Sequence, residues 1–353
     1  MKSTINWGLI GCGWVARDYV APAILGAPSA QLLALCDVNA RATERIQEFA
    51  PDTQSFSDLG ELLACDGLDA VYIATPNHLH RPLCEAAARA GKHVLCEKPM
   101  ATTLADARAM VEVCAQNGVV YATAFDQRFH AAHRLLREKI KAGELGEVTA
   151  LRIHYACWTP TDWRPASDDG AHENWRVDPT KAGGGAFIDL APHGLDLAQM
   201  LLDEELVEIA CLLQRRVFDY AVDDGAVLIG RFGSGALLTH NVAYNCPDAF
   251  PRRTLEVVGT RAMARLHNTL GQTPGGTFEL ISAQSGETRR VELDARFDVS
   301  PFQNGIEAFS RCLLESKAFP FSAGRDLHTM AVLEAATQGA GGIHIEPGER
   351  IAL

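Results

Sequence analysis

The chain has 353 residues, of which 47% are hydrophobic, so it is long and apolar enough for about two domains with packed cores. This composition excludes a disordered, collagenous or low-complexity protein. The formal net charge of −12, from 32 basic and 44 acidic residues, argues against nucleic acid or an anionic membrane as the main partner. No apolar run approaches the ~18 residues that a membrane-spanning helix needs.

Cysteine usage predicts a reduced, cytoplasmic protein. None of the ten cysteines forms a Cys-x-x-Cys pair, so no zinc site and no thioredoxin-like site is predicted. Most lie in apolar stretches, where a free thiol behaves as a small hydrophobic side chain. The segment Leu9–Cys12 resembles a lipoprotein cleavage box, but the apolar stretch before it is short and broken by Asn6 and Gly8, so we expect no secretion signal.

The first third of the chain alternates between two kinds of segment. Short apolar segments predict strands at 5–10, 31–36, 69–74, 92–96 and 119–124, and the segments between them predict helices at 14–25, 40–50, 78–90 and 103–116. Strands that alternate with helices of this length indicate parallel βαβ units. Residues 1–124 are therefore predicted to form an α/β domain with a parallel sheet.

The pattern changes after about residue 125. A helix is expected at 128–142, and β-rich segments predict strands at 148–157, 206–217, 225–232, 236–244, 254–258, 277–281 and 289–293. Short turns such as Phe232–Gly235 are typical of antiparallel hairpins. Two further helices are expected near 302–315 and 325–339. Residues 125–353 are thus predicted to form an α+β domain, whose closing helices are candidates to pack back on the first domain.

A glycine turn follows the first predicted strand. The segment from Gly11 to Ala16 matches the pattern G-x-G-x-x-A, in which Gly11 permits a tight turn and Gly13 lets the backbone approach a pyrophosphate. The following helix offers free N–H groups and a partial positive charge to the anion. An ordinary strand–turn–helix is the alternative, but the position between the correct elements favours a dinucleotide site.

Asp37 ends the second predicted strand, near the position where an acidic residue binds the adenosine ribose. A carboxylate ~4 Å from a 2′-phosphate costs roughly 4 kcal/mol at an effective dielectric of 20, and less where solvent screens it. Val38 and Asn39 offer no cation, and Arg41 is the nearest. We therefore predict NAD rather than NADP as the cofactor.

Two further motifs bring side chains suited to proton transfer. Lys98 lies in Glu97-Lys98-Pro99 at the end of a predicted parallel strand, where ligands of such sheets bind; a solvated surface lysine is the alternative. Asp189 and His193 follow the run Gly183–Gly185 and share one helix face, although Pro192 predicts a distorted helix. With Lys98 they form a possible proton relay. A capping Asp with a core His is the alternative, and no third ligand for a metal is evident.

The segment 158–181 is long and irregular, and loops of this length are often functional. It contains Trp158, Trp163, Arg164, His172, Glu173, Trp175, Arg176 and Asp178. Tryptophans with polar neighbours are suited to stacking on sugar faces, with Trp175 and Arg176 as the first choice for contact. A structured loop whose tryptophans fill a small core is the alternative.

These motifs, in this order, resemble the glucose–fructose oxidoreductase / inositol dehydrogenase (Gfo/Idh/MocA) family. The glycine turn, the Glu97–Pro99 turn and the glycine run with Asp189 and His193 carry the resemblance, together with Ala74–His80 and Gln127–Phe129 at the domain junction. It covers essentially the whole chain. Ala191 and Pro192 depart from the small pair, often containing glycine, that is expected before the histidine.

The resemblance implies an N-terminal Rossmann domain, a C-terminal domain with a large, open and mainly antiparallel sheet, and the oxidation or reduction of sugars, cyclitols or related polyols with NAD or NADP. It implies Lys98, Asp189 and His193 as catalytic residues. The expected cofactor-binding residues are Gly11, Gly13, Trp14, Val15, Asp37, Thr75, Pro76, Asn77, His80, Glu97 and Lys98. The expected substrate-binding residues are Lys98, Arg128, Trp163, Trp175, Arg176, Asp189 and His193, with no metal.

The implied reaction assigns one role to each catalytic residue. His193 removes a hydroxyl proton as hydride leaves for nicotinamide, Lys98 holds the same oxygen, and Asp189 orients His193 or binds a neighbouring hydroxyl. Two alternatives remain: a glycosidase that works through transient oxidation by NAD, and a sensor that binds the dinucleotide without turnover. The open sheet of the family implies a homodimer or homotetramer.

Overall fold

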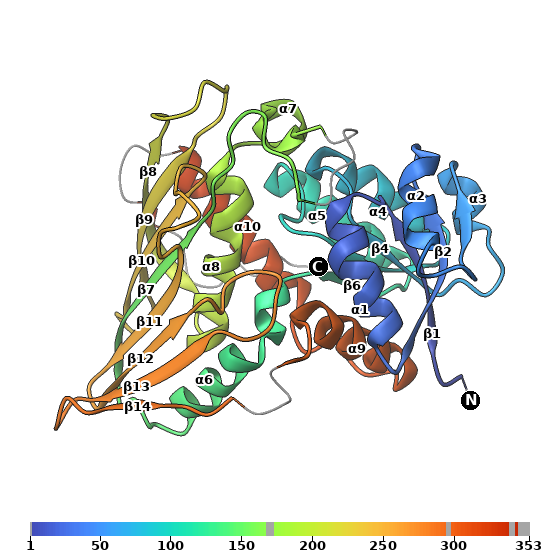
Figure 1. Ribbon diagram of the computed structural model, residues 1–353. Helices are drawn as coiled ribbons and strands as arrows, with labels where there is room; N and C mark the ends of the chain where they lie inside the picture. Colours follow the sequence, from blue (N-terminus) through green and yellow to red (C-terminus); the bar gives the residue numbers. More distant parts are fainter. Residues whose placement is uncertain (1, 167–172, 294–297, 339–342, 345–353) are drawn as a thin grey trace.

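The computed structural model describes residues 2–166, 173–293, 298–338 and 343–344. Its first sheet has six parallel strands in the order β3-β2-β1-β4-β5-β6 (Figure 1). The strands are β1 (Ile5–Ile10), β2 (Ala30–Cys36), β3 (Gln54–Phe56), β4 (Ala70–Ile73), β5 (His93–Cys96) and β6 (Tyr121–Thr123). This order places the carboxyl ends of β1 and β4 at the switch point where dinucleotides bind in such sheets.

Helices connect these strands as the sequence predicts, and helix α3 (Leu59–Leu63) and strand β3 are additions. The helices and helical turns are the π-helical turn η1 (Ala16–Val20), α1 (Ala21–Gly26), α2 (Ala40–Gln47), α3, the 3₁₀ turn η2 (Asn77–Leu79), α4 (His80–Arg89) and α5 (Leu104–Gln116). The Thr103 hydroxyl accepts a hydrogen bond from the Asp106 N–H at 3.1 Å and so caps α5. The sequence analysis missed β3 and α3, because each is too short to show a clear hydrophobic period.

The second sheet contains nine strands among the described residues, in the order β14-β13-β12-β11-β7-β10-β9-β8-β15. They are β7 (Val148–Ala156), β8 (Leu206–Gln214), β9 (Gly225–Phe232), β10 (Leu237–Ala243), β11 (Arg253–Gly259), β12 (Ala262–His267), β13 (Thr277–Ser282), β14 (Thr288–Arg290) and β15 (Ile343–His344). All neighbours are antiparallel except β7 and β10. The mainly antiparallel sheet is therefore confirmed, and β12 and β15 are additional strands.

Helices cover one face of this second sheet. They are α6 (Ala131–Lys141), α8 (Ala186–Leu202) and α10 (Ala323–Gln338), with α8 lying against β7 and β10 and α10 against β8. Figure 1 shows α8 and α10 between the sheet and the first domain. Short helical turns η3 (Asp126–Phe129), η4 (Trp175–Val177) and α7 (Pro179–Ala182) complete the connections. The start of α8 consequently faces the carboxyl ends of the parallel strands.

The last helices join the two domains. Helix α9 (Pro301–Leu314) packs against α1 and β1 of the first domain. Its Ser310 hydroxyl accepts a hydrogen bond from Trp7 Nε1 at 3.1 Å, and its Glu307 accepts one from the Ser29 N–H at 2.8 Å. Helix α10 packs against α5 as well as α8. Within the described ranges, no helix combines the length and apolar character needed to cross a bilayer.

Candidate active site

Two adjoining cavities lie at the carboxyl ends of the parallel strands. The larger, about 540 Å³, is lined by the glycine turn and Asp37. The smaller, about 290 Å³, is lined by Lys98 from the first domain and by Asp189 and His193 from the second. Trp14, Ala74, Thr75 and Trp175 line both. The two cavities therefore form one groove, with a part lined by the glycine turn and Asp37 and a part lined by Lys98, Asp189 and His193.

The glycine turn fits a dinucleotide. Gly11 has φ +85°, and a Cβ there would lie 2.8 Å from the Thr75 methyl carbon, so only glycine allows this packing. A Cβ on Gly13 would meet nothing within 4 Å, so the backbone there is open to a ligand. Thr75 Oγ1 and Trp14 Nε1 are buried without a hydrogen-bond partner in the part of the chain that the structure describes. Buried polar atoms are normally paired, so these two indicate a polar ligand.

Other predicted cofactor residues take several positions around this groove. Asp37 accepts hydrogen bonds from the N–H groups of Cys12 at 2.7 Å and Asn39 at 2.9 Å. These bonds fix its carboxylate at the edge of the larger cavity. Pro76 lines the larger cavity, whereas Val15 and Asn77 line the smaller one. Arg17, Arg41 and Arg45 also line the larger cavity.

Lys98 and Asp189 form the polar centre of the smaller cavity. Lys98 Nζ lies 2.7 Å from Asp189 Oδ1 and also donates to the Asp189 carbonyl at 2.9 Å, while the Tyr244 hydroxyl donates to Oδ2 at 2.8 Å. Burial alone would raise the pKa of Asp189, but the charges of Lys98 and Arg176 outweigh burial and hold this pKa well below its usual range. Asp189 is thus a fixed anion near neutral pH and not a proton carrier.

His193 has a different carboxylate beside it from the one expected. Its Nδ1 lies 3.3 Å from Asp126 Oδ1, although the geometry is not that of a hydrogen bond and neither atom has another partner among the described residues. The ring of Tyr155 packs edge-on against the imidazole, with the centroids 5.3 Å apart. Among the described residues, the Asp189 carboxylate pairs with Lys98, Tyr244 and Arg176 and not with the His193 imidazole. Asp126 therefore replaces Asp189 as the residue placed to orient the imidazole.

The sequence analysis missed Asp126, Tyr155 and Tyr244. Asp126 directly precedes the Gln127–Phe129 motif, and this adjacency was the available signal. The two tyrosines lie on or next to strands β7 and β10, and nothing in their sequence surroundings separates them from core aromatic residues. The pKa of Tyr244 is raised well above its usual value by burial and by the Asp189 charge. This phenol is therefore protonated and acts as a hydrogen-bond donor.

Glu97 lines the same cavity from the first domain. The Tyr72 hydroxyl donates to its Oε1 at 2.7 Å, and the Lys98 N–H donates to its Oε2 at 3.2 Å. Burial raises the pKa of Glu97, while the nearby Lys98 charge opposes the rise. Both oxygens are used within the protein, so Glu97 holds the turn that carries Lys98.

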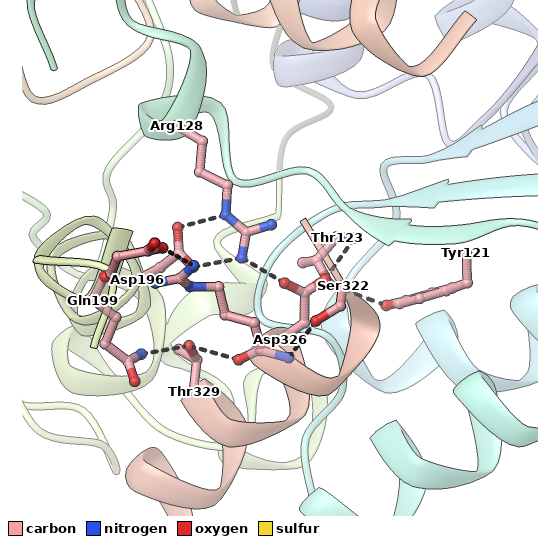
Figure 2. Close-up of polar contacts among 10 residues, drawn as sticks. Tyr121, Thr123, Arg128, Asp196, Gln199, Ser322, Asp326 and Thr329 are labelled. Carbon is pink, nitrogen blue, oxygen red and sulfur yellow. Dashed lines mark hydrogen bonds and ion pairs between the residues drawn. The ribbon is translucent and has the colours of Figure 1, made fainter. Parts of the chain in front are cut away.

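Arg128 requires a correction, because it does not reach the cavity. Its side chain is fully buried, and its Nε donates to Asp196 at 2.8 Å while Nη2 also bonds Asp326 (Figure 2). The guanidinium lies 4.6 Å from the ring centroids of both Phe125 and Phe321. The expected role in substrate binding is replaced by a structural one, since this side chain ties η3 to α8 and α10.

His80 requires a similar correction. It is fully buried, with Nε2 3.0 Å from the Thr75 carbonyl oxygen and Nδ1 3.0 Å from the Pro99 carbonyl oxygen. Both ring nitrogens are used inside the protein and none is left for a cofactor. Burial lowers the pKa of this imidazole. His80 instead links the Thr75 turn to the turn that carries Lys98.

Aromatic residues of the long loop line the smaller cavity, and their expected contact with a substrate stays a prediction. Trp163 and Trp175 line the smaller cavity with Arg176. The indole of Trp163 packs edge-on against Trp14 at 5.7 Å, and the Arg176 guanidinium lies 4.6 Å from the Trp175 ring centroid. His172 lies outside the described residues. Among the residues that are described, no three His, Cys, Asp or Glu side chains gather closely enough to hold a metal ion.

Comparison with known proteins agrees with this fold and groove. Residues 5–125 match the family model described as "Oxidoreductase family, NAD-binding Rossmann fold", and residues 133–265 match the GFO/IDH/MocA C-terminal domain. The 1,5-anhydro-D-fructose reductase of Ensifer adhaerens is 33% identical over 95% of this chain and 97% of its own length. The myo-inositol 2-dehydrogenase of Thermotoga maritima is 30% identical over 72% of each chain.

A solved structure extends the likeness to three dimensions. The aldose-aldose oxidoreductase of Caulobacter crescentus, crystallised with glycerol, superposes with a TM-score of 0.83 at 25% identity, over 97% of this chain and 100% of its own. The match includes both domains. The chain therefore belongs to the Gfo/Idh/MocA family of NAD(P)-dependent oxidoreductases.

Proposed function

We propose that this oxidoreductase transfers a hydride between NAD and a carbon–oxygen group of a sugar, cyclitol or related polyol, with Lys98 and His193 as its catalytic residues. The observation that carries the proposal is that Lys98 and His193, from different domains, line one cavity that joins the glycine-turn groove. The matched relatives, a sugar reductase and an inositol dehydrogenase by name, support the substrate class.

The side chains divide the work at the substrate oxygen. A bound nicotinamide dinucleotide supplies the hydride acceptor or donor. The Lys98 ammonium, held by Asp189, binds the reacting oxygen and favours alkoxide character on it. Because Nδ1 of His193 is buried beside Asp126, we infer that Nε2 faces the cavity and takes or returns the hydroxyl proton. Asp189 stays ionised and is free to accept a hydrogen bond from a neighbouring substrate hydroxyl.

The experiment that tests this proposal is a substrate panel. Purified enzyme is mixed with aldoses, anhydro sugars and cyclitols plus NAD or NADP, and absorbance is followed at the reduced-nicotinamide band. Turnover of at least one sugar or cyclitol is expected. Release of nitrophenol from a chromogenic glycoside without net NADH would instead indicate a glycosidase, and dinucleotide binding without any turnover would indicate a sensor.

NAD is the preferred cofactor in this proposal. Asp37 is fixed at the edge of the larger cavity by two backbone N–H groups, so it offers acceptors to ribose hydroxyls and repels a 2′-phosphate. Three arginines line the same cavity, and arginine side chains would favour NADP. A titration can therefore clearly contradict the prediction of NAD. Fluorescence titration is expected to give weaker binding for NADPH than for NADH, and equal affinity would contradict the assignment.

We further propose that the outer face of the second sheet joins subunits in a homodimer or homotetramer. Three of its apolar side chains, Val227, Ile229 and Leu237, are 44%, 55% and 54% exposed, and no described helix covers this face (Figure 1). Exposed apolar patches of this kind are typical of interfaces. Light scattering is expected to give a dimer or tetramer, and Ile229→Asp is expected to lower that mass towards the monomer.

A cytoplasmic location completes the proposal. All ten cysteines are free thiols, and Sγ of Cys84 lies 3.6 Å from Sγ of Cys114 without a bond between them. Free thiols this close are typical of a reducing compartment. Cell fractionation that recovered the protein outside the cytoplasm would contradict this part.

A further inference from the structure

Apart from Asp126, which faces His193, the acidic groups that line the smaller cavity already have partners inside the protein. Asp189 is bound by Lys98 and Tyr244, and Glu97 is bound by Tyr72. Asp248 forms an ion pair with Arg252. Few carboxylate oxygens around this cavity are therefore left to accept hydrogen bonds from a substrate.

One cation of the cavity, Arg253, has no such partner among the residues that the structure describes. Arg253 begins strand β11, next to Tyr155 of β7 in the sheet register, and lines the cavity. Its Nε is buried without a hydrogen-bond partner, and no carboxylate of the described residues lies within ion-pair distance of its guanidinium. A second guanidinium, that of Arg176, also has a buried unpaired nitrogen, Nη1, and reaches Asp189 only at 3.7 Å.

The protein holds the Arg253 guanidinium in a defined place. Its central carbon lies 5.8 Å from the Tyr155 ring centroid. On another side is Gly271, where φ is +126° and a Cβ would come within 2.4 Å of Nη1 of Arg253. A side chain at position 271 would therefore displace the guanidinium. A cation on a rigid strand, packed between a ring and a glycine, is a built binding group and not a mobile surface residue.

This arrangement has a chemical consequence. A buried polar group without a partner is costly, and an unpaired charge more so. The planar fork of arginine matches the two oxygens of a carboxylate or phosphate. The Tyr155 ring contacts both His193 and Arg253, so one aromatic ring separates the proposed proton-transfer group from the guanidinium. A substituent a few atoms from the reacting carbon would reach it.

We propose that Arg253, with Arg176 beside the same cavity, forms a subsite for an anionic substituent, so that the preferred substrates are acidic sugar or cyclitol derivatives carrying a carboxylate or a phosphate. This inference rests on the proposed function and names its substrate class more closely. The neutral parent sugar lacks the acceptor that the guanidinium needs and binds less well.

The test compares matched substrates in matched variants. D-glucose, D-glucuronate and D-glucose 6-phosphate are assayed with NAD on the wild type, Arg253→Gln, Arg253→Lys and Arg311→Gln. Arg311 is an exposed residue of α9 that pairs with Glu315, so its variant removes the same charge far from the cavity. We expect the wild type to favour one acidic sugar over glucose at least tenfold. Loss of a charge-assisted hydrogen bond is expected to lower kcat/KM for that acid by about 10- to 100-fold in Arg253→Gln.

The remaining variants separate charge from geometry. Arg253→Lys keeps the charge but not the fork and is expected to recover part of the loss, while Arg311→Gln is expected to match the wild type. A carboxylate and a phosphate are distinguished by which acid is favoured. An equal loss with glucose and with the acids, a wild-type preference for glucose, or weaker NADH binding in Arg253→Gln would each overturn the subsite.

A binding measurement keeps this test independent of turnover. The melting temperature of the NADH complex is measured with each of the three sugars at equal concentration and ionic strength. Greater stabilisation by an acid than by glucose, lost in Arg253→Gln, supports the subsite even if none of the three sugars is oxidised, and the wider panel of sugars and cyclitols then decides the proposed function separately. Equal or absent stabilisation by all three, with or without turnover, overturns the subsite.

Discussion

Two polar contacts join the turn η3 to helix α8, and they differ in whether the facing side chains hydrogen-bond each other. Asp126 and Arg128 lie two residues apart on η3, and each faces a residue of α8: Asp126 faces His193, and Arg128 faces Asp196. The Arg128 contact is fully buried and is extended by Asp326, which also accepts a hydrogen bond from the Thr123 N–H at 3.1 Å (Figure 2). The Asp126 contact borders the cavity, and within the described part of the chain its facing atoms lack hydrogen-bond partners.

The difference teaches where this fold keeps its reactive groups. The same pair of elements carries both contacts, so the buried ion cluster fixes the distance and angle at which His193 meets Asp126. The Arg128 contact is made by hydrogen bonds through Nε and Nη2 and supports the structure, although Nη1 has no partner among the described residues. In the proposed function, the contact beside the cavity, whose facing atoms do not hydrogen-bond each other, is the one that exchanges a proton with the substrate.

The largest effect is expected for the two side chains proposed to act on the substrate, His193 and Lys98. Replacing His193 by Ala, or Lys98 by Ala, is expected to lower turnover by about 10²–10⁴-fold, the usual contribution of acid–base help. Steady-state kinetics measures the loss, and fluorescence titration is expected to show unchanged NADH affinity. Unchanged turnover in both variants would remove these residues from the mechanism.

The contact of Arg128 with Asp196 and Asp326 is expected to affect stability instead of catalysis. Arg128→Met leaves Asp196 and Asp326 buried without their cation, which is expected to cost about 3–5 kcal/mol of unfolding free energy. Urea denaturation measures this value. Arg137→Met is the matched control, because Arg137 pairs with the exposed Asp203 and is expected to cost below about 1 kcal/mol. Equal costs in the two variants would show that the buried cluster adds nothing beyond a surface ion pair.

A smaller effect is expected for the partner of His193. Asp126→Asn keeps the size of the side chain but removes the charge that orients the imidazole, so kcat is expected to fall about 10-fold, with little change in KM or NADH affinity. Asp126→Glu is expected to recover part of kcat. A loss in melting temperature without a selective loss of kcat would make Asp126 a structural residue only.

The last effect is confined to acidic pH and concerns two buried histidines that do not line the groove. Burial lowers the pKa of His130 and of His240 to about 4, below the ~6.5 of an unfolded chain. The unfolded state therefore takes up protons first as the pH falls, and stability is lost between about pH 6.5 and pH 4. Each histidine is expected to cost up to ~2 kcal/mol at pH 5.

His240→Gln tests this pH dependence directly. Melting temperatures measured from pH 7 to pH 5 are expected to fall less steeply in this variant than in the wild type. His78→Gln is a suitable control, since His78 is solvent-exposed on the first domain. Parallel slopes for all three proteins would show that His240 titrates alike in the folded and unfolded chains.

The fold and the main side chains of the candidate site could be predicted from the sequence, because both depend on local pattern. Within each motif the residues are close in sequence: the glycine turn, the Lys98 turn and the pair Asp189 and His193 each span only a few positions. The errors have a different origin. Arg128 and His80 belong to recognisable motifs, but a motif does not tell whether a side chain points into a cavity or into the core. The partnership of Asp126 with His193 exists only because η3 crosses α8, which no local pattern reports.

The short elements show the same limit on the level of secondary structure. Strand β3 and helix α3 contain few buried residues, so they lack the periodicity that makes longer elements readable. The sequence likewise could not predict where the Arg253 guanidinium lies. Its position depends on Gly271 and on the ring of Tyr155, which come from other parts of the chain.

Helix α9 has a consequence for the order in which the protein is completed. The side chain of Trp7, on the first strand, is fully buried and donates its hydrogen bond to Ser310. During synthesis the ribosome makes these two residues some three hundred codons apart. The nascent Rossmann domain therefore exposes an apolar surface until α9 has been synthesised, and a chain halted before α9 would be a natural client for chaperones.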